Sequence, residues 1–110
     1  MLALSSPLLF HPPLVLYMAG QARASHILVK TEEEAHRILK RINDGEDFIA
    51  VAKRFSSCPS RKNGGDLGWF GKGQMVPEFE KVVFENEAGN VIGPVKTQFG
   101  YHIIKVTGRK

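Results

Sequence analysis

Residues 91–107 read VIGPVKTQFGYHIIKVT, and this stretch predicts two β-strands joined by a short turn. β-Branched and aromatic residues fill both halves, and the triplet QFG at residues 98–100 has the length and the glycine of a hairpin turn. Pro94 lacks a backbone N–H, so we expect the first strand at a sheet edge or a bulge. In the second strand, His102 shares one face with Ile104 because side chains alternate along a strand.

A second β-branched run, SHILVK at residues 25–30, predicts another strand. The same alternation places His26 on one face of this strand and Ile27 on the other. We interpret it as a central strand. An antiparallel sheet could then place His26 and His102 on neighbouring strands.

Two amphipathic helices are predicted after this strand. Thr31 and Glu34 form a capping-box pattern, and the helical spacing of apolar residues continues to about Asn43. Gly45 is placed to end this helix. The same spacing returns over residues 48–55 and predicts the second helix.

The segment between these helices and the final hairpin combines turns with two short elements. Residues 56–73 are rich in glycine, serine and lysine, and residues 67–70 suit a short strand. Pro77 fits the first turn of a third, short helix. Strand, helices and hairpin in this order predict an α+β domain on an antiparallel sheet.

Size and composition indicate one soluble globular domain. The chain has 110 residues, and a hydrophobic share of 43% with 24% charged residues suits one compact core. The net charge of +4 is spread along the chain and forms no concentrated basic patch, so it gives little support for a nucleic-acid-binding function.

Every charged residue follows Ala22, so we separate residues 1–22 from a domain at residues 23–110. The first block is apolar like a secretory signal, but it lacks a positive start and is interrupted by three prolines. Met18 opens a segment that reads as a natural start. We expect disorder before about Arg23, in either an over-extended N-terminus or a targeting peptide.

Cys58 is the single cysteine, which excludes an intramolecular disulfide and makes a reducing, cytoplasmic location the default expectation. Four scattered histidines and one thiol do not supply the close ligand pairs of a structural zinc site. We therefore expect no metal and no other cofactor.

His26 and His102 have two interpretations. Both could be buried structural histidines, or they could form a functional pair. With Cys58 they could also suggest a cysteine hydrolase or a three-ligand metal site, but the sequence shows no recognisable nucleophile context and no polarising group. Leu67, Met75 and Phe79 are equally ambiguous. They suit a core, or an apolar pocket for a proline ring, because Met75 and Phe79 are four residues apart.

Four stretches, SHILVK, SSCPS, GGDLGWFGKGQMVPEFEKVVF and GPVKTQFGYHIIKV, resemble the parvulin family of peptidyl-prolyl isomerases in order and spacing. The resemblance covers nearly everything from Ala24 to Lys110 and looks nearest to the small single-domain bacterial and archaeal members. It implies a parvulin/FKBP-like fold, with a four-stranded antiparallel sheet surrounded by three to four short helices. It also implies a PpiC-type rotamase domain that interconverts cis and trans X-Pro bonds during protein folding.

The resemblance assigns roles position by position. It assigns four polar positions to the catalytic set: His26, Cys58, Thr97 and His102. It assigns three apolar positions to the pocket that binds the proline ring: Leu67, Met75 and Phe79. Phe99 stands where some members have a small polar residue, so we expect it to make the rim of this substrate pocket more apolar.

Rotation about an X-Pro bond cleaves no bond to carbon, so we expect a non-covalent mechanism. The phosphate-directed branch of the family carries an arginine-rich loop after its first strand. Residues 30–34 occupy that position here, and their three carboxylates would repel a phosphate. The expected partners are therefore proline-containing peptides and unfolded protein segments, without dependence on phosphoserine or phosphothreonine.

Two other functions stay open from the sequence. A non-catalytic, chaperone-like module of the same fold would bind such segments without turning them over. A nucleic-acid accessory protein would use the net charge of +4 and lose affinity steeply with salt. We expect a monomer that requires neither nucleic acid nor a membrane.

Overall fold

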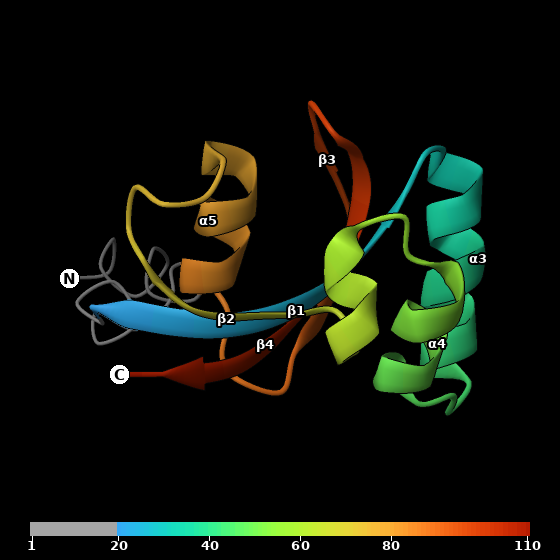
Figure 1. The fold of residues 1–110 in the computed structure, drawn as a ribbon, viewed down its shortest axis with the longest axis horizontal. Coiled ribbons are helices and arrows are strands. Elements are labelled where there is room, and N and C mark those ends of the chain that lie inside the picture. The colour runs from blue at the N-terminus through green and yellow to red at the C-terminus, as the bar shows by residue number, and fades with distance from the viewer. Residues whose placement is uncertain (1–19) are drawn as a thin grey trace, which may run out of the picture.

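The computed structural model describes residues 20–110, which form a four-stranded antiparallel sheet with helices around it (Figure 1). In chain order the elements are β1 (Gln21–Val29), α3 (Glu32–Asn43), α4 (Phe48–Phe55), the 3₁₀ helix η1 (Pro59–Asn63), β2 (Asp66–Gly71), α5 (Pro77–Phe84), β3 (Val91–Thr97) and β4 (Gly100–Arg109). The predicted α+β class and the predicted antiparallel sheet are confirmed.

The strand order β2-β1-β4-β3 makes β1 and β4 the central strands. Their register pairs Leu28 with His102 and His26 with Ile104, so the two strand histidines lie on neighbouring strands, two pairs apart and on the same face. β3 is an edge strand, and its pairing with β4 shifts around Pro94, as the missing N–H of proline predicts.

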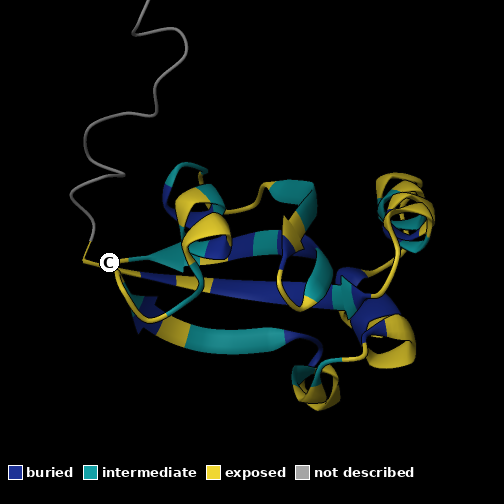
Figure 2. Cartoon of the chain, turned by 90° about the horizontal axis from the view of Figure 1, so that it is seen from above, coloured by how far each residue is buried: buried dark blue, intermediate teal, exposed yellow. Residues whose placement is uncertain are grey.

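The two faces of the sheet bury different helices because alternate side chains point in opposite directions. We call the face under α5 the pocket face; it contributes these buried residues to one core: Ala22, Ala24, Phe70, Ile104 and Val106. We call the face under α3 and α4 the packing face; its strands contribute Ile27, Val29 and Ile103 to the other core. Figure 1 shows α5 separated from α3 and α4 by the sheet, and Figure 2 shows the central strands largely buried between exposed helical surfaces.

The helix signals of the sequence operate as predicted. Thr31 Oγ1 accepts a hydrogen bond of 3.1 Å from the Glu34 N–H and caps α3. Gly45 follows the end of α3 with a φ of +107°, a conformation that glycine adopts without steric cost. Asp47 caps α4 through the Ala50 N–H, a signal that the apolar spacing alone did not give.

The first strand begins earlier than predicted. β1 starts at Gln21, whereas the sequence placed the strand from residue 25 and the domain from residue 23. Ala22 is fully buried on the pocket face and pairs with Phe70 and Arg109, so tertiary packing extends the strand beyond its β-branched run. The rest of the predicted N-terminal block, residues 1–19, lies outside the described residues. Within residues 20–110, no helix is long and apolar enough to cross a membrane.

Candidate active site

A pocket of about 350 Å³ opens on the pocket face, a size that suits a small ligand group. Its walls come from β1, the segment that leads into η1, β2, the loop before α5, α5 itself, the β3–β4 turn and β4. It is lined by His26, Leu28, Ser57, Cys58, Pro59, Leu67, Met75, Val76, Phe79, Phe99 and His102. Seven of the eight predicted site residues therefore line one cavity, and Thr97 is the exception.

His26 and His102 form the polar floor of this pocket. Their Nδ1 atoms lie 2.8 Å apart, which is a hydrogen bond between the two rings. The ring planes differ by 20°, and the side chains are almost fully buried. The predicted placement on neighbouring strands is confirmed, and the pair is both buried and part of the cavity.

Burial keeps both histidines neutral. Loss of hydration, and to a smaller extent the nearby His102, together lower the pKa of His26 to about 4. Burial also lowers the pKa of His102. At neutral pH one ring must therefore donate the proton of the Nδ1–Nδ1 hydrogen bond and the other must accept it.

Thr97 decides which histidine donates. Its Oγ1 accepts a hydrogen bond of 3.2 Å from the Phe99 N–H and lies 2.7 Å from Nε2 of His102. The hydroxyl hydrogen then goes to His102 Nε2, so we assign the proton of His102 to Nδ1, from which it is donated to His26. Thr97 thus lies behind the pair, outside the cavity wall.

The His26 ring is neutral and its Nδ1 accepts this hydrogen bond, so its single proton lies on Nε2. This nitrogen is buried and has no hydrogen-bond partner within residues 20–110. Unpaired buried polar atoms are rare and cost free energy, so a polar group at this position is a feature of a functional site more often than of a plain core.

Cys58 reaches the pocket because the chain before it is tied to the end of β1. Ser56 Oγ accepts hydrogen bonds from the N–H groups of Leu28 and Cys58 at 3.1 and 3.3 Å. The Ser57 N–H donates to the carbonyl of Leu28 at 2.8 Å. Sequence reasoning missed Ser56 and Ser57 as positioning residues, although both lie in the SSCPS stretch, because Leu28, to which both are hydrogen-bonded, is 28 and 29 residues away along the chain.

Gly65 fixes the other end of this loop. Its carbonyl accepts a 2.9 Å hydrogen bond from the His26 N–H, and its φ is +87°. A Cβ atom at this position would lie 2.3 Å from the carbonyl oxygen of His26, which is too close for any side chain. The η1 loop therefore contacts the strand that carries the first histidine, and glycine permits the contact.

The apolar wall stands directly on the histidine floor. Phe79 packs edge-to-face on His26 and on His102, with ring centroids 5.6 and 5.5 Å away, and it is 3% exposed. Met75 and Leu67 are partly buried against the same core. Phe79 therefore belongs both to the core and to the cavity wall, and the proline-binding role of these three residues stays a prediction. Leu28, Pro59 and Val76 complete the wall and were missed, since apolar lining residues look like core residues in a sequence.

No group of three His, Cys, Asp or Glu side chains within residues 20–110 is arranged to hold a metal ion. The Nδ1 atoms of the two histidines face each other and are engaged in their mutual hydrogen bond. The three-ligand interpretation of Cys58, His26 and His102 therefore gains no support from the geometry.

Comparisons with known proteins agree on one family. The model of the family described as "Rotamase: PPIC-type PPIASE domain" matches residues 19–108. The foldase protein PrsA of Geobacillus sp. (strain WCH70) is 55% identical over 89 residues, which cover 80% of this chain and 32% of that protein. PrsA of Bacillus subtilis (strain 168) is 50% identical over 91 residues, covering 82% and 31%. The chain spans about a third of the length of these curated relatives.

Solved structures show the same similarity in three dimensions. The crystal structure of the peptidylprolyl isomerase PrsA from Bacillus anthracis superposes with a TM-score of 0.82 at 44% identity, covering 84% of this chain and 43% of that chain. The solution structure of NmPin, the parvulin of Nitrosopumilus maritimus, gives a TM-score of 0.73 at 43% identity, covering 82% of this chain and 98% of that chain.

Proposed function

This chain belongs to the PPIC-type peptidyl-prolyl isomerase family, the parvulins, and we propose that its pocket accelerates rotation about X-Pro bonds by a non-covalent mechanism. The observation that carries the proposal is the composition of the cavity, in which an apolar wall stands on a neutral, mutually hydrogen-bonded histidine pair. Such a cavity is suited to a proline ring and its adjoining amide.

The apolar wall supplies the grip. Rotation must overcome a barrier of about 18 to 20 kcal/mol because the partial double bond of the amide is broken. If Leu67, Met75 and Phe79 hold the proline ring while the preceding carbonyl turns, the site can bind the twisted amide better than either planar isomer. A reduction of about 5 kcal/mol in the barrier would accelerate exchange by nearly four orders of magnitude.

The surroundings of the carbonyl contribute a second effect. The planar amide is stabilised by charge separation, and water stabilises that separation further. A carbonyl moved from water into this largely apolar cavity loses part of that stabilisation, which favours the twisted form. The buried Nε2–H of His26 and the thiol of Cys58 are the polar groups that could then act on the oxygen.

Covalent attack by Cys58 is the weaker alternative. A nucleophilic thiol needs an adjacent base, and within residues 20–110 neither histidine is hydrogen-bonded to Cys58. The two Nδ1 atoms are hydrogen-bonded to each other, and Nε2 of His102 is hydrogen-bonded to Thr97. A Cys58→Asp variant that keeps most of the activity would exclude a covalent step, and a complete loss would favour one.

The residues that line the pocket also support an activity that does not depend on phosphorylation of the substrate. Among the described residues that line the pocket there is no Lys and no Arg, so a phosphate on the residue before proline would find no charged partner. We expect proline-containing peptides and unfolded protein segments as substrates. We also propose a cytoplasmic location, because Cys58 is a free thiol. We propose a monomer as well, and light scattering on the purified chain tests the oligomeric state.

The experiment is exchange NMR on short X-Pro peptides, with Met75→Ala as the variant of the apolar wall. We expect the wild-type chain to accelerate cis/trans exchange and the variant to lose at least about tenfold, because truncation removes part of the grip. A Ser-Pro peptide and its phosphorylated form should differ little in the acceleration. Binding without acceleration would identify the chain as a chaperone-like binding module, and acceleration that requires the phosphate would contradict phosphate independence.

A further inference from the structure

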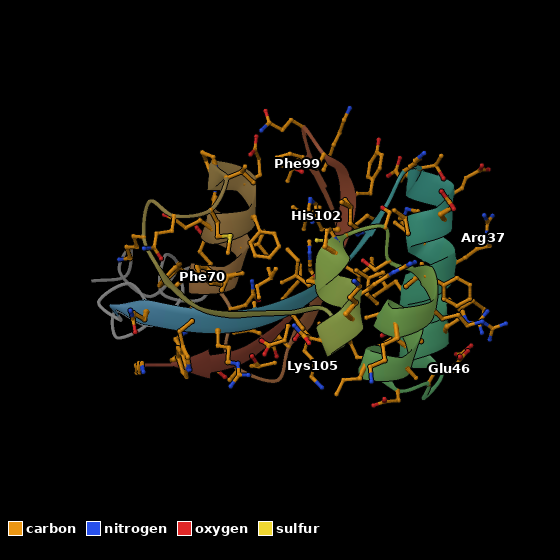
Figure 3. The ribbon with its side chains drawn as sticks, in the orientation of Figure 1. Arg37, Glu46, Phe70, Phe99, His102 and Lys105 are labelled. Atoms are coloured by element: carbon orange, nitrogen blue, oxygen red, sulfur yellow. The ribbon has the colours of Figure 1, made fainter. Side chains whose placement is uncertain are left out.

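The loop between β2 and α5 carries two residues of the apolar wall. Residues 72–76 form this loop, and its Met75 and Val76 line the pocket while remaining only half-buried. Figure 3 shows the loop on one side of α5 and the labelled His102 on the other. Phe79 follows on α5, is 3% exposed and packs against both histidines. The helical part of the wall is therefore fixed by the core, whereas the loop part lies nearer to solvent.

The backbone of this loop is weakly bonded to itself. Residues 72–74 are exposed, and Gly73 has a φ of +90°. The Gln74 N–H reaches the carbonyl oxygen of Gly71 over 3.4 Å, which is long for a backbone hydrogen bond. Exposed loops with little packing open at a small cost in free energy. The position of Met75 therefore depends on contacts made by side chains.

Two side chains supply such contacts. Glu80 lies in the first turn of α5, and its Oε1 accepts a hydrogen bond of 2.5 Å from the Gly73 N–H. Gln74 Oε1 accepts a hydrogen bond of 2.8 Å from the Gly71 N–H, at the end of β2. A carboxylate is a stronger acceptor than an amide oxygen, so the Glu80 bond is the stronger of the two.

The bond between Gly73 and Glu80 joins the loop to the helix across the wall. It closes a ring made of residues 73–80, and both Met75 and Phe79 lie within that ring. Phe79 is already held by its edge-to-face packing on the histidines. The bond therefore relates Met75 to a fixed point of the pocket and sets the separation between the two side chains.

We propose that Glu80 is a positioning residue, which holds Met75 at the distance from Phe79 that fits a proline ring. This inference rests on the proposed function, in which these two side chains grip that ring. Glu80 is not among the described residues that line the pocket, so it acts through the loop and not on the substrate. A wall that is ordered in advance binds more tightly, because less conformational freedom is lost on binding.

The test compares Glu80→Ala with Glu80→Gln in the full chain, by exchange NMR over a range of concentrations of an X-Pro peptide. Glu80→Ala removes the acceptor, so KM should rise by about fivefold, the equilibrium factor of one ordinary hydrogen bond. kcat per folded molecule should change by less than about twofold, because the loop is ordered when the peptide binds. Glu80→Gln keeps a side-chain oxygen and should hold KM within about twofold of the wild type.

Two readouts show whether Glu80 acts through Met75. The ¹³C methyl signal of Met75 should shift in Glu80→Ala and keep its wild-type position in Glu80→Gln. In a chain that already carries Met75→Ala, Glu80→Ala should change KM by less than about twofold, because the side chain that it positions is absent. A loss of stability without a change in KM or in the methyl signal would make Glu80 a structural residue and overturn the inference.

Glu78→Ala is the matched control. Glu78 is an exposed glutamate in the same first turn of α5, so both substitutions remove the same charge from the start of the helix. This variant should leave KM and the Met75 methyl signal as they are in the wild type. An equal rise in KM in Glu78→Ala would assign the effect to helix electrostatics and contradict the role of Glu80.

The same measurements separate this inference from the function on which it rests. A wild-type chain that accelerates exchange, with an equal KM in every variant, would overturn the inference and leave the isomerase function intact. A wild-type chain that accelerates no peptide would overturn the proposed function, and the inference would be lost with it.

Discussion

The two faces of the sheet are built from alternate residues of the same two central strands, yet they have become different environments. On the packing face, Ile27 and Ile103 are fully buried beneath α3 and α4. On the pocket face, His26 and His102 occupy the adjacent positions and lie beside a cavity. Because a strand has a period of two, one residue step separates a position that only packs from a position that can act on a substrate.

The difference has an energetic side. The pocket face keeps two neutral imidazoles away from water, and His26 Nε2 has no hydrogen-bond partner among residues 20–110; both features oppose folding. The packing face carries closely packed aliphatic side chains, whose burial favours folding. The packing face therefore offsets the cost of the pocket face. A substitution on the packing face should therefore lower mainly the stability, and a substitution at the neighbouring position on the pocket face should lower mainly the activity.

The largest expected effect is on the packing face. Ile103→Ala removes a fully buried side chain and should lower the free energy of unfolding by about 4 kcal/mol. We expect kcat/KM per folded molecule to stay within about twofold, since the side chain points away from the pocket. Urea denaturation and exchange NMR measure the two quantities.

His102→Asn, one position earlier, is the comparison for this variant. It should lose activity by at least about tenfold, because the hydrogen-bonded pair is broken while a polar group remains. If Ile103→Ala abolished catalysis in molecules that remain folded, the separation of the two faces would be wrong.

Acid should destabilise the chain through the pocket face. His26 has a pKa of about 4 in the folded chain and an ordinary value of 6.5, so the unfolded chain binds a proton first as pH falls. Stability is therefore unaffected by this group above about pH 6.5 and declines between pH 6.5 and 4, by about 3 kcal/mol in total. Below that range the folded chain also takes up the proton and the loss levels off.

The measurement is the free energy of unfolding between pH 7.5 and 4, for wild type and for His26→Gln. The variant should show a shallower decline because one of the two buried imidazoles is absent. Equal pH dependence in the two proteins would mean that His26 is not the group that makes the fold acid-sensitive.

Gly65→Ala tests the contact that joins the loop to the pocket face. A methyl group would meet the backbone of His26 at 2.3 Å, and the φ of +87° disfavours alanine in addition. We expect a loss of about 2 kcal/mol of stability together with reduced activity, because relief of the clash displaces the histidine strand. Gly68→Ala is the control: Gly68 has a φ of +74° but no atom within 4 Å of its Cβ position, so its loss should be smaller. Similar losses at both positions would assign the effect to backbone strain alone.

The two faces also differ in how well they could be predicted from the sequence. Alternation along residues 25–30 and 101–107 predicted which side chains share a face, and the helix signals at Thr31 and Pro77 predicted where helices begin. These are local patterns. The site roles of Leu67, Met75 and Phe79 came from the family resemblance, because apolar residues of a pocket and of a core have the same local signature.

Contacts between distant segments could not be predicted in the same way. Ser56 and Gly65 act through backbone groups of Leu28 and His26, which are close to them only in the folded chain. Ala22 joined the first strand for the same reason, since its partners are Phe70 and Arg109. Residue type and spacing describe the sequence neighbourhood, whereas these positions are defined by the sheet register.

The smallest expected effect concerns the residue behind the pocket. Thr97→Val removes the hydroxyl that accepts from the Phe99 N–H and donates to His102 Nε2, while the shape of the side chain is nearly unchanged. The free energy of unfolding should fall by about 1 kcal/mol, the usual loss for such a hydrogen bond. The proton of His102 is then no longer restricted to Nδ1, so the ¹⁵N shifts of both imidazoles should change, and activity should fall by several-fold.

Thr107→Val is the control for this substitution, because Thr107 is an exposed threonine of β4. It should leave the imidazole shifts and the exchange rates as they are in the wild type. If Thr97→Val lowered stability by the same amount but left the ¹⁵N shifts unchanged, Thr97 would be a structural residue of the β3–β4 turn. Burial of the two rings, and not the Thr97 hydroxyl, would then determine which nitrogen of each histidine carries the proton.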